Sequence, residues 1–205
     1  MNAKFLLGAA LLITYPLALH FMLIGQRTAW AAVLLSAVLI LYLLLVSARH
    51  PAPRVLGYFI LAISLPILAY YLGYFIYLIY ILPPLIYLLL FWVFVRTLRA
   101  GEEPLITRIS KIERGGSIPA DLLGYTRGLT ELWSVFFILM ALSSLFLAAF
   151  APLHVWSFFS NILSYLLTAA FFIVEYAIRK RRFPHHSHSS PLKIARRIAD
   201  NGFRF

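Results

Sequence analysis

The sequence predicts an all-α, polytopic membrane protein with about six transmembrane helices and a cytoplasmic interfacial helix. Of its 205 residues, 62% are hydrophobic and only 12% are charged, which leaves too little polar surface to cover a soluble globule. Apolar runs recur along the chain, and most approach the roughly 20 residues that a helix needs to cross a bilayer. Lys and Arg gather between alternate runs, as they do in cytoplasmic loops. The whole chain, 1–205, is therefore expected to form one membrane domain.

The apolar runs define six expected spans, at residues 5–25, 29–48, 55–72, 74–95, 129–150 and 155–178. Only Gln26, Arg27 and Thr28 separate the first two runs, which indicates a helical hairpin. Residues 55–95 contain no charged side chain, and this stretch is too long for one helix across a hydrocarbon core of about 30 Å. We therefore expect the chain to turn back near Gly73.

The basic residues orient the spans. With six spans and both termini in the cytoplasm, 17 of the 18 Lys and Arg lie on the cytoplasmic side and Arg27 alone lies outside. This asymmetry follows the positive-inside rule, and odd numbers of spans would scatter the charges over both faces. Trp30 and Trp156 are then expected at the outer headgroup level, and Trp92 and Trp133 at the inner one.

The N-terminus leaves one alternative open, because residues 1–19 combine a basic start with an apolar middle and so resemble a cleaved signal peptide. The apolar run is long for a signal peptide. Its removal would also leave an odd number of spans, which would spoil the charge distribution.

The largest loop, residues 96–128, is expected on the cytoplasmic side. Within it, Leu105, Ile109 and Ile112 share one stripe of a short helix that begins at Pro104. The opposite side of that helix carries the cations Arg108, Lys111 and Arg114. A basic amphipathic helix beside a membrane lies in the interface, near anionic headgroups. A second helix is expected to enter through Pro119 and to continue into the fifth span. One interpretation of the loop is therefore an interfacial elbow that joins two groups of spans.

The other interpretation is a functional site at the cytoplasmic mouth of the bundle. Glu175 precedes Arg179 by one helical turn, and Arg127 precedes Glu131 by the same interval, so both pairs have the i,i+4 spacing of helical ion pairs. Such groups act as structural glue or as a polar mouth for an anionic or hydroxyl-bearing substrate, and both hypotheses stay open. The candidate mouth residues are Tyr125, Arg127, Glu131, Glu175 and Arg179.

The last span carries a polar stripe at helical spacing. Polar side chains that face lipid are costly, whereas across helices they hydrogen-bond for roughly 0.6–2 kcal/mol each. The stripe is therefore expected to face protein rather than lipid. Its members, besides Glu175, are Ser157, Asn161, Ser164 and Thr168.

The sequence predicts neither a metal nor a cofactor. There is no cysteine, and hence no thiolate zinc site, iron–sulfur cluster or cysteine nucleophile. His185, His186 and His188 fall in the basic cytoplasmic tail, residues 179–205, where a solvated tail is favoured over a set of metal ligands. The net charge of +11 indicates topology and a membrane surface rather than nucleic-acid binding.

Two segments carry a resemblance to a known family. The pattern RGG…P…YTR…T..W..FF from Arg114 to Phe137, with EY…RRRF.HH from Glu175 to His186, is similar to an uncharacterised family of bacterial membrane proteins. Its members are encoded in aryl-polyene and xanthomonadin-type gene clusters, beside acyl carrier proteins, ketosynthases and acyltransferases, and they are often mislabelled as DNA gyrase. The hydropathy and the lack of a phosphate-binding glycine loop argue against a gyrase. The resemblance implies carrier-protein-dependent lipid or pigment synthesis in the inner membrane, and it assigns no catalytic residues.

These observations favour a non-enzymatic accessory or scaffold protein in such a pathway. Acyl carrier proteins are acidic, so Arg108, Lys111 and Arg114 form the expected docking surface. Membrane lipids, pathway enzymes and further copies of the chain are the other expected partners. Two alternatives belong to different classes: a small oligomeric transporter or flippase for lipids or polyenes, and a membrane-embedded acyltransferase-like enzyme that uses Glu131 or Glu175.

Overall fold

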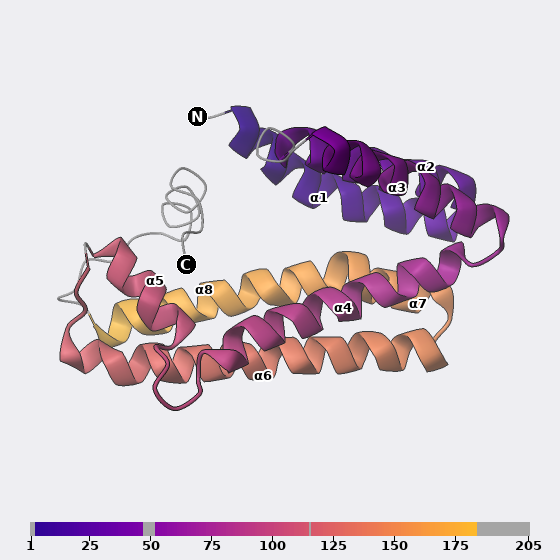
Figure 1. Cartoon of the computed structure of the whole chain (residues 1–205). Helices are drawn as coiled ribbons and strands as arrows, with labels where there is room; N and C mark the ends of the chain where they lie inside the picture. The colour runs from indigo at the N-terminus through magenta and orange to yellow at the C-terminus, as the bar shows by residue number, and fades with distance from the viewer. Residues whose placement is uncertain (1–2, 47–51, 115, 184–205) are drawn as a thin grey trace. The chain divides into compact units, whose positions relative to one another are not determined.

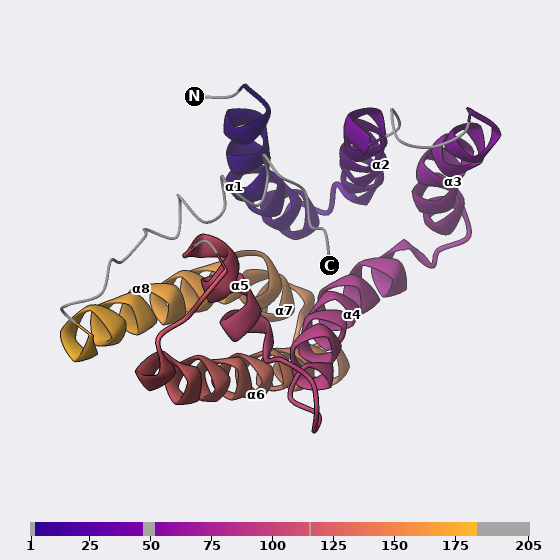
Figure 2. The same cartoon turned by 60° about the vertical axis from the view of Figure 1, so that its left-hand side comes forward.

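The computed structural model describes residues 3–46, 52–114 and 116–183, and every regular element within them is a helix (Figures 1 and 2). Three helices are long and apolar enough to cross a membrane by length and composition. They are α4 (Phe75–Arg96), α6 (Ala120–Phe150) and a continuous helix, Leu153–Arg182. The last of these consists of α7 (Leu153–Phe158), a π-helical turn η2 (Phe159–Leu163) and α8 (Ser164–Arg182). The predicted all-α class is confirmed.

Three helices precede these: α1 (Ala3–Ile24), α2 (Thr28–Val46) and α3 (Ala52–Tyr71). Their bounds lie within three residues of the predicted runs. The α1–α2 and α3–α4 turns are built alike, since the Arg27 amide donates to the Met22 carbonyl at 2.8 Å and the Tyr74 amide donates to the Ala69 carbonyl at 2.8 Å. This bond closes a helix end only when the residue before the donor is left-handed. Gly73 (φ 77°) and Gln26 (φ 56°) fill that position, and the turn expected near Gly73 is confirmed.

The chain forms two compact units. Among the described residues, unit 1 consists of 3–6, 86–114, 116–140 and 166–183, and unit 2 consists of 7–46, 52–85 and 141–165. In unit 2, Trp156 is completely buried among residues such as Leu23, Ala31 and Ile79. The Tyr80 ring packs against Trp156 in an edge-to-face contact with 4.6 Å between centroids, a geometry that aromatic quadrupoles favour.

Trp133 is the buried tryptophan of the hydrophobic core of unit 1. It is buried beside Phe137, and its ring lies 4.4 Å from Phe171 and 4.5 Å from Phe172. Both rings are therefore packed against protein side chains, and the prediction that Trp133 and Trp156 lie at headgroup level stays a prediction. Trp30 and Trp92 are exposed, as an interfacial role requires.

The short helix α5 (Leu105–Glu113) is fastened to the rest of unit 1 by threonines. At its N-terminus the Leu105 amide donates to Thr97 Oγ1 at 3.0 Å, and the Ile106 amide donates to Thr130 Oγ1 at 3.3 Å. Thr107 and Thr126 exchange a hydrogen bond of 2.7 Å between α5 and α6. These hydroxyls satisfy amides that an isolated helix start leaves unpaired.

The residues of the predicted apolar stripe of α5 consequently differ in burial. Leu105 is buried inside unit 1, while Ile112 is 62% exposed. Residues 120–128, which the sequence analysis counts in the connection between the fourth and fifth spans, form the start of α6, so the predicted helix that enters through Pro119 and continues into the fifth span is confirmed. Tyr125, Arg127 and Glu131 therefore lie on a helix that is continuous with the apolar part of α6.

Candidate functional site: a pocket between α6 and α8

The polar stripe of the last helix is buried, as predicted, at four of its five positions. Ser157 and Ser164 are completely buried, and Asn161 and Glu175 nearly so, whereas Thr168 is partly exposed. Ser157, Asn161 and Ser164 belong to unit 2, and Thr168 and Glu175 belong to unit 1. The two ends of the stripe are therefore described separately.

In unit 2 the stripe meets a histidine that was not predicted to join it. His20 of α1 is buried, and its Nδ1 lies 2.9 Å from Ser157 Oγ. The Asn161 side-chain amide donates to Ser157 Oγ at 3.1 Å and to the Ser157 carbonyl at 3.0 Å. This network pairs polar groups that lipid cannot satisfy. Asn161 lies within the π-helical turn η2, and such turns often mark functional positions. Ser157 has no exposed surface, however, so a ligand has no access to it.

In unit 1 the stripe ends in a three-residue cluster, consisting of Tyr125, Glu175 and Arg179. The Tyr125 hydroxyl donates to Glu175 Oε1 at 3.1 Å and so joins α6 to α8. Arg179 Nε lies 3.2 Å from the same oxygen, and the side chains of Arg179 and Glu175 are 17% and 9% exposed. The arginine contact is an ion pair rather than an aligned hydrogen bond. The predicted i,i+4 pair is confirmed, and it leaves this buried cluster without net charge.

Arg127 and Glu131 form a second pair that stands apart from this cluster. Their side chains are 3.3 Å apart and more than half exposed, and Arg127 also donates to the Leu98 carbonyl at 3.3 Å. The structure therefore does not bring all five candidate mouth residues into one cluster. Tyr125 and Arg127 are two residues apart, which places them on nearly opposite sides of α6.

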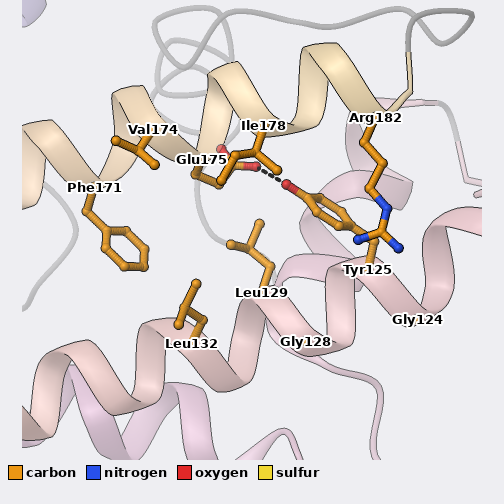
Figure 3. A pocket seen from close by; sticks show the side chains of 10 residues that line it. All are labelled: Gly124, Tyr125, Gly128, Leu129, Leu132, Phe171, Val174, Glu175, Ile178 and Arg182. Carbon is orange, nitrogen blue, oxygen red and sulfur yellow. Dashed lines mark hydrogen bonds between the residues drawn. The ribbon is translucent and has the colours of Figure 1, made fainter.

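A pocket of about 340 Å³ opens between α6 and α8 beside the buried cluster (Figure 3). Its polar lining is Tyr125, Glu175 and Arg182, and Gly124 and Gly128 form part of its α6 side. An apolar wall completes it, made of Leu129, Leu132, Phe171, Val174 and Ile178. Such a combination, mostly apolar with a few convergent polar groups, is typical of a ligand site.

Two glycines and Arg182 line the pocket although the sequence did not predict them as site residues. Gly124 and Gly128 lie one turn apart on α6, and Arg182 lies two turns after Glu175 on α8. Both spacings are visible in the sequence. What could not be read there is that these two helical faces meet.

The predicted docking cations lie on α5, where acids of the same loop offset two of them. Arg108 is 3.8 Å from Glu102, and Lys111 forms an ion pair with Glu103. Arg114, the third, is partly buried at the end of α5. Electrostatic attraction from this surface is therefore weaker than a count of its cations suggests.

Scans of the chain against protein-family models, curated proteins and solved structures find no match. Within residues 3–46, 52–114 and 116–183, no cluster of three or more His, Asp or Glu side chains is arranged to hold a metal ion. The tail histidines His185, His186 and His188 lie outside the described residues.

Replacing Glu175 tests the buried cluster. Glu175→Ala removes the acceptor of the Tyr125 hydroxyl and leaves the largely buried Arg179 without its counter-charge, so we expect a loss of about 1–3 kcal/mol in unfolding free energy. Glu175→Gln retains an oxygen acceptor and should cost less. Glu131→Ala is the matched control, because an exposed pair contributes about 0–1 kcal/mol. Thermal unfolding in detergent measures all three, and equal melting of the two alanine variants would contradict the cluster's role.

Proposed function

We propose that this chain is an integral inner-membrane accessory protein that holds an amphipathic chain in the pocket between α6 and α8. The pocket combines an apolar wall with the polar side chains of Tyr125, Glu175 and Arg182, and Arg182 stands at its polar end, near Gly124 (Figure 3). This combination is the observation that carries the proposal. A hydrocarbon chain gains free energy by covering the wall, while its head remains at the polar end. The proposed setting is a pathway that builds lipid or aryl-polyene chains on an acyl carrier protein.

The proposed topology has six spans with both termini in the cytoplasm. Helices α1, α2 and α3 contain 22, 19 and 20 residues, which is close to the roughly 20 that a span requires. With the three longer helices they account for every apolar run in the sequence. The Lys and Arg distribution supports this orientation. It places α5 and the polar end of the pocket on the cytoplasmic side, where a soluble carrier protein is available.

A transporter or flippase is the second candidate, because buried polar side chains recur along the last helix from Ser157 to Glu175. Residues of this kind mark polar pathways in transporters. An acyltransferase is the least favoured alternative. Glu175 Oε1 accepts a hydrogen bond from Tyr125 and forms an ion pair with Arg179, so this oxygen is poorly available for proton abstraction. Glu131 is exposed and paired with Arg127.

Cysteine labelling tests the topology without interference, because the chain contains no native cysteine. Single cysteines at Ser117 and Ser189 should react with a membrane-impermeant maleimide only after the membrane is opened. Cysteines at Gln26 and at Ala151, beside Pro152, should react in intact spheroplasts. Reaction of the Ser117 variant from outside would contradict the proposed threading.

Carrier docking is tested by varying the charges around α5. Changing Arg108, Lys111 and Arg114 to Glu should reduce recovery of the pathway's acyl carrier protein, because the carrier is acidic. Glu102→Gln with Glu103→Gln removes the acids that offset Arg108 and Lys111, and should increase it. Higher salt should weaken every interaction, since the Debye length falls from about 10 Å at 0.1 M to about 3 Å at 1 M.

The measurement is a pull-down with the purified full-length chain at both salt concentrations. A parallel measurement of binding to anionic vesicles serves as the control, because a helix that only anchors to lipid loses vesicle affinity and not carrier binding. Equal carrier recovery by all variants at both salt concentrations would exclude docking through α5.

A further inference from the structure

We infer that the α6–α8 pocket selects a single-chain amphiphile with a monoanionic head, a long-chain carboxylate, whose carboxylate binds Arg182. This inference rests on the proposed function and specifies its ligand. It follows from the charges, the placement of the lining groups along α8 and the size of the pocket.

The charges at the pocket leave one cation for a ligand. Arg179 balances the charge of the Glu175 carboxylate, and the Tyr125 hydroxyl already donates its hydrogen bond to that carboxylate. Arg182, in contrast, has no acidic partner among the described residues. Its guanidinium lies 5.9 Å from the Phe183 ring centroid, and that ring packs against Tyr125 at 5.1 Å. These ring contacts hold Arg182 at the polar end of the pocket.

The orientation of the ligand follows from the places of these groups along α8. Arg182 lies seven residues after Glu175, which is about 10 Å along the helix axis. Figure 3 shows Arg182 at the end of the pocket near Gly124, and Phe171 at the opposite end. A carboxylate on Arg182 therefore leaves its chain to run past Ile178 toward Leu132 and Phe171.

A single-chain carboxylate matches the site better than a phosphate monoester or a lipid with two chains. A guanidinium forms paired hydrogen bonds with one carboxylate, and the single charge of that head balances the single available cation. A phosphate monoester carries more charge than Arg182 neutralises. The volume of about 340 Å³ is at the lower end of the range for ligand pockets, which favours one chain over two.

The glycines provide a means to close the pocket without disturbing the fold. A Cβ added at Gly124 or Gly128 meets no atom within 4 Å. Gly128 is helical and does not require a left-handed backbone. A leucine there should therefore fill the α6 side of the pocket while favouring the helix. Gly57 of α3 is equally open and lies in unit 2, so Gly57→Leu is a matched control.

The test measures binding of cis-parinaric acid, a fluorescent long-chain carboxylate, and of its neutral methyl ester to the purified full-length protein in mild detergent. The acid should bind the wild type about tenfold more tightly than the ester, as expected for one partly exposed charge-assisted contact. Arg182→Gln should remove this preference. Arg181→Gln should retain it, because Arg181 also lies in the last turn of α8 but does not line the pocket.

The variants separate failure of this inference from failure of the proposed function. Gly128→Leu should abolish binding of acid and ester alike, and Gly57→Leu should not, with unchanged melting as evidence of folding. Equal binding of acid and ester, unaltered by Arg182→Gln, would overturn the carboxylate inference and leave the chain-binding pocket in place. Binding that survives in a folded Gly128→Leu variant would overturn the pocket itself, and with it the proposed function.

Discussion

The contact between Tyr125 and Glu175 is the interaction on which the candidate site depends. It joins α6 to α8 through a hydrogen bond of 3.1 Å to a carboxylate that also faces Arg179 at 3.2 Å. Burying a carboxylate costs several kcal/mol unless a counter-charge and hydrogen bonds offset the loss of water. Arg179 supplies the charge from the same helix and Tyr125 supplies the hydrogen bond from the other. The carboxylate therefore stays buried only while α6 and α8 remain together, and the pocket beside it exists under the same condition.

The same principle explains the other polar contacts of the chain. A sequence that is 62% hydrophobic offers few polar partners, and lipid offers none. Many polar side chains in the helices consequently bind one another or a neighbouring carbonyl, as His20 does with Ser157, Thr107 with Thr126, and Ser134 with the Thr130 carbonyl. The bonds of His20 with Ser157 and of Thr107 with Thr126 join different helices, so they help to set which helical faces meet within each unit. The threonines also determine where α5 rests on α6.

Much of this structure could be predicted from local sequence patterns. Apolar runs predicted the helix bounds to within a few residues, except at the start of α6, which lies at Ala120 rather than at residue 129. The i,i+4 spacings of Glu175 with Arg179 and of Arg127 with Glu131 correspond to ion pairs in the structure. Choices between distant partners could not be predicted. Trp133 and Trp156 suit an interface as well as a core by chemistry, and their burial depends on neighbours brought by other helices. Tyr125 rather than Arg127 contacts Glu175. The rotation of α6 about its own axis determines which of these two side chains faces α8, and the sequence does not give that rotation.

The most direct test of this account is a double-mutant cycle between Tyr125→Phe and Glu175→Ala, followed by equilibrium unfolding of the full-length protein. The cycle isolates the energy that the two side chains share from the packing that each loses alone. We predict a coupling energy of about 1–2 kcal/mol, as expected for a largely buried hydrogen bond to a charged acceptor. Additive effects of the two substitutions, with no coupling, would show that this contact does not hold α6 and α8 together.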